Sequence, residues 1–250
     1  MTEGLFNRTE LLLGSKALER IHEKRIIIFG VGGVGSWCAE CLIREGIGHL
    51  TLVDSDRVCI TNCNRQLMAT TLTLGLPKVE ALRSRLLEIN PEADILALQR
   101  SFSKETAGTF QLEEYDYVID AIDSLKDKTA LILQTTGTLP GGKRVAGFFS
   151  SMGAALRTDP TKVRVSEFWK VKGDPLAAAI RSSMRRQKLF PASKFLCVHS
   201  EEPPLPNLGT ALKDGSQTFT KVRTNGSLCH VTAIFGMTLA GLVVQDICCN

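Results

Sequence analysis

The 250-residue sequence lacks a long uninterrupted apolar run, which argues against a membrane-spanning segment. Its most apolar stretch, residues 231–244, contains Gly236 and Gly241 and is shorter than the ~20 residues that cross a bilayer. This stretch is interpreted as a buried helix, with attachment to a membrane surface as the minor alternative. Residues 1–20 carry charges throughout and lack the apolar core of a signal peptide. The sequence therefore predicts a cytoplasmic protein without a membrane span.

The second half of the sequence also lacks the paired cysteines of a structural zinc site. Such sites commonly use two C-x-x-C pairs, whereas the late cysteines here are two isolated residues and one adjacent pair. No structural zinc is expected. Cys38 and Cys41 do form a C-x-x-C, but inside a predicted helix, where this spacing places two small apolar side chains on one face. For these two, and for Cys197 and Cys229, packing is favoured over a catalytic role.

The sequence also has little net charge. The 30 Lys and Arg residues exceed the 26 Asp and Glu residues by only four, which permits a nucleic-acid partner without demanding one. Positive charge is concentrated in one predicted helix that starts near Asp174 and carries Arg181, Arg185, Arg186 and Lys188. A solvated helix face and contact with an RNA phosphate backbone are both consistent with this run, so both interpretations stay open.

Glycines, by contrast, gather at one point. The apolar run of residues 25–29 is followed by Gly30, Gly32, Gly33 and Gly35, and then by a helix-compatible segment. This order predicts a strand, a tight turn and a helix N-terminus. Residues without side chains let a phosphate approach the backbone N–H groups, whose partial positive charge the helix dipole reinforces. The segment therefore predicts a phosphate-binding turn.

The residues after the next predicted strand decide which phosphate compound is expected. Asp54 ends that strand, where a carboxylate can accept hydrogen bonds from ribose hydroxyls. Asp56 follows, and then Asn62, Arg65 and Gln66. A glycine turn alone is also typical of nicotinamide and flavin dinucleotide sites. An arginine beside amide side chains suits a triphosphate better, because a guanidinium neutralises and orients phosphoryl oxygens. A loop-capping role is the alternative for Arg65 and the asparagines.

Two further positions are candidates for the same site. Lys78 stands at the start of a predicted helix, over residues 77–90, and is placed near the phosphates. Asp120 and Asp123 follow a predicted strand whose carboxyl end is where ligands of open parallel sheets bind. Two carboxylates there can hold Mg²⁺ through oxygen ligands and waters. Asp123 alternatively caps the helix predicted over residues 124–134, and the two roles are compatible.

At this point the sequence resembles the ATP-dependent adenylating enzymes of the ubiquitin-activating type, a family that includes the thiamine and molybdopterin sulfur-carrier activators (ThiF, MoeB and HesA). The resemblance runs from Gly30 to Asp123, with the motifs in the family's order and at its spacing. It implies that ATP and Mg²⁺ bind here. The roles implied are Asp54 on the ribose, Asn62, Arg65 and Lys78 on the phosphates, and Asp123 on the Mg²⁺.

The remainder of the chain resembles one branch of that family, the tRNA threonylcarbamoyladenosine dehydratases. The matching segments, which together cover nearly the whole chain, are Arg8–Gly14, Gly35–Trp37, Asp120–Asp123, Asp159–Thr161, Asp174–Ala177, Val198–Glu202, Gly226–Ser227 and Thr232–Gly236. The resemblance implies a homodimer in which Arg8 reaches the partner's triphosphate, and it makes Arg8, Arg65, Lys78 and Asp123 the predicted catalytic residues. The sequence departs from this pattern at His199, Glu201 and the prolines of residues 203–206, all in the predicted substrate-binding half.

The resemblance implies a reaction on tRNA. The carboxylate of threonylcarbamoyladenosine in the anticodon loop would attack the ATP α-phosphate, and the resulting acyl-adenylate would cyclise with net loss of water. The alternatives are adenylation of a ubiquitin-like sulfur carrier, a non-catalytic nucleotide-binding scaffold and, more remotely, a nicotinamide enzyme. Partner proteins for sulfur or electron transfer, and binding of a monovalent cation, are left open.

The fold expected is α/β and Rossmann-like, with a mainly parallel sheet, helices on both faces and a smaller C-terminal substrate lobe. Residues 1–250 are expected to form one domain, in which residues 1–150 are the nucleotide-binding half and residues 151–250 the substrate- and RNA-binding half. The predicted strands are residues 25–30, 50–54, 94–98, 117–120 and 143–149. The predicted helices are residues 16–22, 36–45, 77–90, 104–112 and 124–134, with a further helix from Asp174.

Overall fold

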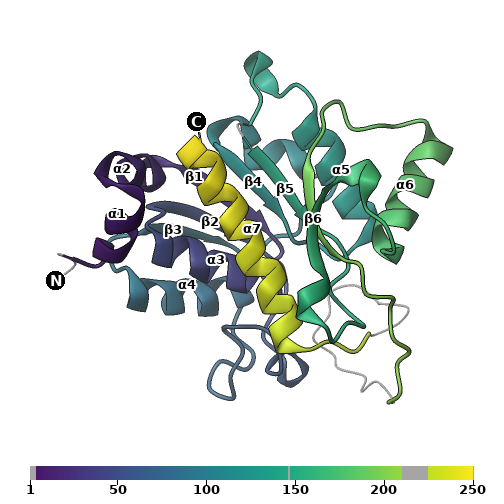
Figure 1. Ribbon diagram of the computed structural model, residues 1–250, viewed down its shortest axis with the longest axis horizontal. Helices are drawn as coiled ribbons and strands as arrows, with labels where there is room; N and C mark the ends of the chain where they lie inside the picture. Colours follow the sequence, from purple (N-terminus) through teal and green to yellow (C-terminus); the bar gives the residue numbers. More distant parts are fainter. Residues whose placement is uncertain (1–3, 146, 210–224, 250) are drawn as a thin grey trace.

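A twisted seven-stranded sheet forms the centre of the molecule (Figure 1). The structure, a computed structural model, describes residues 4–145, 147–209 and 225–249. The strand order is β3-β2-β1-β4-β5-β7-β6, and every pairing is parallel except that of β6 with β7. The strands are β1 (Arg25–Phe29), β2 (His49–Val53), β3 (Asp94–Leu98), β4 (Tyr117–Asp120), β5 (Gly147–Ser151), β6 (Val163–Glu167) and β7 (Leu196–Ser200). The expected Rossmann-like fold is confirmed.

Helices cover both faces of this sheet. They are α1 (Asn7–Leu13), α2 (Ser15–Glu23), α3 (Gly35–Glu45), α4 (Lys78–Ile89), α5 (Leu125–Thr136), α6 (Pro175–Gln187) and α7 (Cys229–Cys249). Alternation along β1 divides the core, because successive strand side chains point to opposite faces. Ile26 and Ile28 pack with α3, α4 and α7, whereas Ile27 and Phe29 pack with α5 and α6.

Short 3-10 helices replace one predicted helix and delay one predicted strand. The helix predicted over residues 104–112 is wrong, because 3-10 turns at Ala107–Phe110 and Leu112–Glu114 flank Gln111, whose φ of 47° is left-handed. The strand predicted from Lys143 begins only at Gly147, after the 3-10 turn Pro140–Gly142. The other 3-10 turns are Ile60–Asn62, Pro160–Lys162 and Phe168–Lys170.

The C-terminal helix α7 is longer than its sequence suggests. It has 21 residues and a mean hydropathy of 1.7, so by length and composition it could cross a membrane, and the prediction that this segment is too short was wrong. Its inner face is nevertheless buried against α3 and β5. At Gly236 the two helices approach so closely that a Cβ would stand 2.8 Å from the backbone nitrogen of Cys38. In this structure α7 is therefore a packed core helix, as predicted.

Candidate nucleotide-binding site

The glycine turn joins β1 to α3 and has a shape that larger residues cannot adopt. Gly30 has φ of 85°, and a Cβ there would lie 2.7 Å from the carbonyl oxygen of Ala121. A Cβ on Gly35 would collide with the carbonyl oxygen of Gly30. The Ser36 hydroxyl donates to the Gly32 carbonyl at 2.6 Å and locks the turn. The turn thus presents a bare backbone and the N-terminus of α3, as predicted, which is an arrangement suited to phosphate.

Gly33 lies where the turn meets the last helix. A Cβ on this residue would be 3.3 Å from Arg65 Cγ and 3.3 Å from Thr232 Cβ on α7. A Cβ on Gly32 would meet the Gln66 amide nitrogen at 3.7 Å. The turn, the 62–66 loop and α7 therefore meet at one point, although they come from widely separated parts of the chain.

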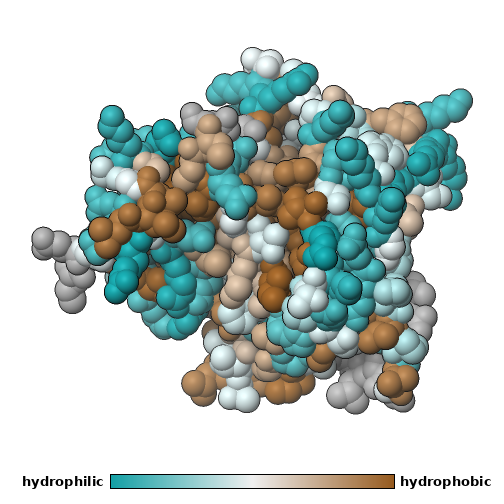
Figure 2. Space-filling model, in the orientation of Figure 1, coloured by the Kyte–Doolittle hydropathy of each residue, from teal (hydrophilic) through white to brown (hydrophobic). Residues whose placement is uncertain are grey.

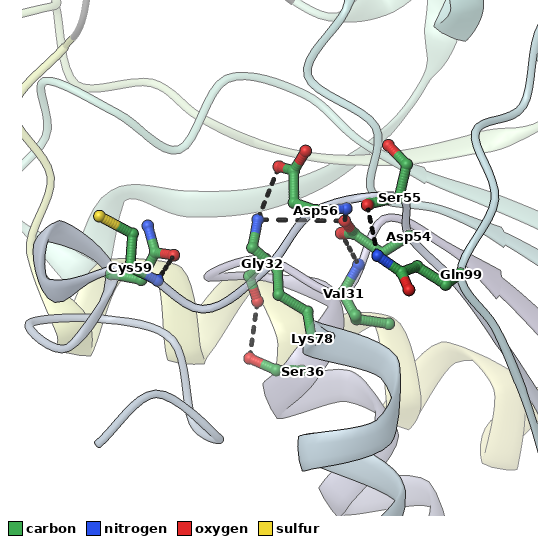
Figure 3. A network of polar contacts seen from close by, with 10 residues as sticks. Val31, Gly32, Ser36, Asp54, Ser55, Asp56, Cys59, Lys78 and Gln99 are labelled. Atoms are coloured by element: carbon green, nitrogen blue, oxygen red, sulfur yellow. Dashed lines mark hydrogen bonds and ion pairs between the residues drawn. The ribbon is translucent and has the colours of Figure 1, made fainter. Parts of the chain in front are cut away.

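An ion-paired network lies beside the turn, at the carboxyl end of β2 (Figure 3). The two Asp54 carboxylate oxygens accept hydrogen bonds from the backbone N–H groups of Val31 and Asp56, both at 2.9 Å. The Lys78 ammonium group lies 2.8 Å from Asp56 Oδ2 and 4.0 Å from Asp54 Oδ1. One hydrogen-bonded cluster thus links the turn, the end of β2 and the start of α4, and it contains three of the predicted site residues.

Burial sets the electrostatics of this cluster. The Lys78 side chain is only 7% exposed and that of Asp54 only 11%. Burial raises the pKa of Asp54 above its usual range, even though Lys78 and the two backbone donors act in the opposite direction. A lysine ammonium has three hydrogens, so Lys78 can hold Asp56 and still donate to a phosphate oxygen. The cluster can therefore offer a cation to phosphates and a carboxylate to a ribose.

The 62–66 loop holds the predicted arginine in an ordered frame. The Arg65 guanidinium donates to the Thr61 carbonyl at 2.9 Å and to the Asn64 amide oxygen at 3.0 Å. The Arg65 carbonyl accepts a hydrogen bond from the indole nitrogen of Trp37 at 3.0 Å. Asn62 is buried, and its side-chain oxygen accepts from the Cys59 backbone at 3.0 Å. The loop-capping alternative therefore describes both Asn62 and the guanidinium of Arg65. The aliphatic part of Arg65 lies against the glycine turn.

Asp120 has surroundings that differ from those expected. Its carboxylate is completely buried, forms an ion pair with Lys128 Nζ at 2.8 Å, and accepts from the Ser150 hydroxyl at 2.7 Å. Lys128 also donates to the Ile122 carbonyl at 2.9 Å. This carboxylate therefore points into the sheet and supports the end of β4 from inside. The idea that Asp120 and Asp123 jointly face a metal does not fit this arrangement.

Asp123 itself lies in the exposed segment that follows β4. The N-cap of α5 is Ser124, whose hydroxyl accepts from the Asp127 backbone at 3.5 Å, so the alternative in which Asp123 caps this helix was wrong. Among the described residues, no three His, Cys, Asp or Glu side chains cluster as metal ligands. Mg²⁺ is commonly held by one or two carboxylates together with substrate phosphates. Asp123 fits such a shared site, and it was predicted as the Mg²⁺ ligand.

The remaining predicted residues lie outside this cluster. Arg8 is exposed on α1, so within one chain it forms no part of the site. On α6, Arg181 donates to the carbonyls of Phe168 and Val171 at 3.0 and 2.8 Å, and Arg185 stacks over the Trp169 ring at 5.5 Å. Arg186 and Lys188 are exposed. The basic helix is therefore partly structural and partly free surface.

The cysteines lie in packing positions wherever they are buried. Cys38 and Cys41 fall within α3, as predicted, and burial raises the pKa of Cys41 to about 11 and that of Cys38 well above its usual value. Burial also raises the pKa of Cys197 well above its usual value. Such thiols are poor nucleophiles at neutral pH, because the thiolate is the reactive form.

Sequence reasoning overlooked two residues that organise the site. Lys128 follows Lys126 and Asp127 in the charged first turn of α5, so nothing in the local sequence marks it as buried. In the sequence, Trp37 is distinguished only as part of the segment Gly35–Trp37, although its indole holds the backbone of Arg65. Both depend on partners that are distant in the sequence.

Comparisons with known proteins agree with this geometry. The ThiF family matches residues 6–135. The tRNA threonylcarbamoyladenosine dehydratase of Bacillus subtilis is 36% identical over 97% of this chain and 94% of its own. The Escherichia coli tRNA N6-threonylcarbamoyladenosine dehydratase TcdA, solved in complex with ATP, is 32% identical with a TM-score of 0.82, covering 97% of this chain and 93% of that one.

A sulfur-carrier activator matches over a shorter region. The molybdopterin-synthase adenylyltransferase of Escherichia coli is 32% identical, but over only 50% of this chain and 51% of its own. Similarity to the dehydratases thus extends through both halves, as predicted, whereas similarity to this activator covers half the chain. With the glycine turn, the Asp54–Asp56–Lys78 cluster and the sheet order in agreement, the chain belongs to the ThiF family.

Proposed function

We propose that the protein is an ATP-dependent tRNA threonylcarbamoyladenosine dehydratase that works through a carboxyl-adenylate. The observation that carries the proposal is the cluster of Asp54, Asp56 and Lys78 beside a bare glycine turn at the carboxyl edge of the sheet. The named relatives support the choice of substrate, because their similarity includes the C-terminal half.

The chain's own residues divide the work of holding ATP. Asp54 binds the ribose hydroxyls, and the backbone of Gly30, Gly32, Gly33 and Gly35 accommodates the phosphates. Lys78 and Arg65 orient the phosphates. The Asn62 side-chain oxygen is engaged by the Cys59 backbone, so its amide nitrogen is the group that can donate to a phosphate. Asp56 holds Lys78, and Gln66 lies beside Gly32. Preorganised cations of this kind stabilise the charge that develops as pyrophosphate leaves.

The reaction then proceeds in two steps. A carboxylate oxygen of threonylcarbamoyladenosine attacks the α-phosphorus of ATP, and pyrophosphate departs. An atom of the carbamoyl group next attacks the activated acyl carbon, loses a proton and expels AMP. The nucleoside has then lost one water and closed a ring. Intramolecular attack has an effective molarity of ~10⁵ M or more, so no enzyme nucleophile is required, in keeping with the raised pKa of Cys197.

Mg²⁺ belongs to the proposal as a companion of ATP. When bound, it would neutralise phosphate charge, and Asp123 is the residue assigned to it. Asp120 is not, because Lys128 already neutralises its carboxylate in the interior. Structural zinc and a resident monovalent cation have no assigned residues.

A homodimer that supplies Arg8 to the partner's site is a further part of the proposal. Leu11 and Leu12 of α1 are 75% and 83% exposed, and Figure 2 shows apolar surface over this end of the molecule. If a second copy of the chain packed on these leucines, Arg8 on the same helix would lie at the interface between the two copies. A cytoplasmic location follows from a tRNA substrate, and partner proteins for sulfur or electron transfer are supported by family resemblance alone.

One second candidate has a specific observation in its favour. The half-length similarity to the molybdopterin-synthase adenylyltransferase spans the nucleotide-binding region. Under this alternative, the acid that attacks ATP would be the C-terminal carboxylate of a ubiquitin-like carrier protein.

The deciding experiment incubates the protein with Mg-ATP and total tRNA and analyses the nucleosides by mass spectrometry. The modified adenosine should lose one water while AMP and pyrophosphate appear, and Lys78→Met should slow both changes by about 10²–10³-fold. A parallel reaction contains a carrier protein ending in Gly-Gly in place of tRNA. Pyrophosphate release in that reaction alone would overturn the proposal in favour of the sulfur-carrier alternative.

A further inference from the structure

The positive charge of this protein is gathered on the side of the molecule away from the nucleotide cluster. Residues 143–144 and 168–194 contain nine of the 30 Lys and Arg residues but only one of the 26 Asp and Glu residues, Asp174. Asp174 is buried and caps α6, so it contributes little to the surface. The remainder of the chain is net negative, with 21 basic and 25 acidic residues. We refer to residues 143–144 and 168–194 as the basic face.

The basic face also bears exposed aromatic rings. Trp169 is 38% exposed and Phe190 is 54% exposed, and no other aromatic side chain in the described part of the chain is exposed. Their ring centroids are 6.1 Å apart. Exposure of two large rings side by side is unfavourable in water, which indicates a surface that another molecule covers.

These two rings are held rigidly from below. Trp169 packs edge-on against Phe168 at 5.2 Å, and Phe168 stacks on Phe195 at 5.0 Å, inside the core. Arg185 lies over the outer face of this cluster, 5.5 Å from the Trp169 ring centre. A partner that stacks here would lose little entropy in ordering the protein, because the rings are already fixed by packing.

Strand direction places this face relative to the nucleotide cluster. β7 begins just after Phe195, and β6, which runs antiparallel, ends just before Phe168. Trp169 and Phe190 therefore lie towards the amino-terminal edge of the parallel strands, with α6 alongside (Figure 1). Asp54 lies past the carboxyl end of β2. β2 and β7 are also four strands apart in the sheet. With ~4.8 Å between neighbouring strands and ~17 Å along a five-residue strand, the two places are on the order of 25 Å apart, a separation that a folded RNA can bridge.

We infer that the basic face, with Trp169 and Phe190 at its centre, binds RNA by stacking unpaired bases on the two rings. Arg185, Arg186 and Lys188 would contact the neighbouring phosphates. Aromatic rings embedded in positive charge are the combination that binds single-stranded nucleic acid, because rings stack with any base and cations follow the backbone. A positively charged helix alone could be a solvated surface, but this one borders two exposed rings. The inference rests on the proposed function only in naming tRNA as the RNA.

The test measures binding of fluorescently labelled total tRNA by anisotropy, without ATP. Trp169→Ala and Phe190→Ala should each weaken binding about 5- to 150-fold, the range for loss of one stacked base. A combined Arg186→Gln and Lys188→Gln variant should weaken binding and reduce its salt dependence. Leu72→Ala, at a 92% exposed leucine elsewhere, and Lys16→Gln with Lys104→Gln are the matched controls and should bind tRNA normally.

Further measurements distinguish loss of RNA binding from misfolding and from failure of the proposed reaction. Phe190 is the more exposed ring, so Phe190→Ala decides the test if Trp169→Ala fails to fold. ATP affinity should be unchanged in Phe190→Ala. Unchanged tRNA affinity in this variant would overturn the inference and assign the rings to a protein partner. If wild-type protein removes no water from tRNA but Phe190→Ala still weakens tRNA binding, the proposed function fails while the RNA-binding face stands.

Discussion

Two lysine–aspartate pairs lie near the carboxyl edge of the same sheet, and they differ mainly in their access to water. Lys78 meets Asp56 at 2.8 Å in a cluster whose Asp56 side chain is 28% exposed, whereas Lys128 meets Asp120 at 2.8 Å with neither side chain exposed. We call Lys78–Asp56 the open pair and Lys128–Asp120 the sealed pair. The open pair can exchange partners when a ligand arrives. The sealed pair cannot, because separating it would leave charges uncompensated in the interior. Two pairs with equal distances therefore differ in whether a ligand could reach them.

The sealed pair should give the largest response to mutation. Lys128→Met leaves the Asp120 charge unpaired, and we expect a loss of about 3–5 kcal/mol in the free energy of unfolding, measured by urea denaturation. Adding Asp120→Asn should restore part of this loss, because the buried charge is then removed. If Lys128→Met unfolds at the wild-type urea concentration, the pair is not sealed as described.

The open pair should show the opposite division between activity and stability. Lys78→Met removes a cation from the phosphates and should lower AMP formation by about 10²–10³-fold. Its cost in unfolding free energy should be only about 1–2 kcal/mol, because Asp56 remains partly hydrated. Lys104→Gln is the surface control for both measurements. A large loss of stability with normal turnover would reverse the roles assigned to the two pairs.

Cysteine labelling measures how well the region around the Lys128–Asp120 pair is protected from water. Cys197 is fully buried, and its pKa is raised by burial and by the Asp120 charge, against the opposing effect of Lys128. We expect iodoacetamide at pH 8 to label the exposed Cys249 readily and Cys197 at least about tenfold more slowly. Peptide mass spectrometry reports each site. Equal labelling rates in the folded protein would show that water reaches the buried pair.

Acidification should have the smallest effect, and it acts through Asp54, which lies beside the open pair. Burial raises the pKa of Asp54, so its carboxylate takes up a proton at a higher pH than an ordinary aspartate. Between pH ~3.9, the ordinary pKa of aspartate, and the raised pKa of Asp54, the folded state therefore binds more protons than the unfolded state. The stability that comes from protonating Asp54 in the folded state is accordingly lost as pH rises through the raised pKa.

ATP affinity should change in the opposite sense. It should fall severalfold as pH drops through the same range, because a protonated Asp54 accepts fewer hydrogen bonds from ribose. Calorimetric titration of ATP between pH 7 and 4 checks this expectation, which an Asp54→Asn variant with the same pH profile would contradict.

The same contrast explains what the sequence could predict. The glycine turn, Asp54 and Lys78 are recognisable because their spacing follows from local geometry, in which a strand end, a turn and a helix start are each a few residues long. The Lys128–Asp120 pair depends on how far α5 tilts over the sheet, which no local pattern encodes. Strand β5 begins late for a related reason: Lys143, just after the turn Pro140–Gly142, is extended, but its carbonyl accepts a hydrogen bond from the Leu139 N–H. The ligand roles of all the predicted site residues, from Asp54 and Lys78 to Arg8, Asp123 and the α6 arginines, remain predictions.

The contact between Gly236 and the start of α3 has a consequence for how the protein is made. The phosphate-binding turn is built early in synthesis, yet the helix that packs behind it, with Thr232 beside Gly33, emerges about 200 residues later. A nascent chain therefore carries an incomplete ATP pocket with an uncovered apolar flank until translation is nearly finished. Ribosome-bound intermediates of this protein should depend on chaperones, and nucleotide can protect only the finished chain.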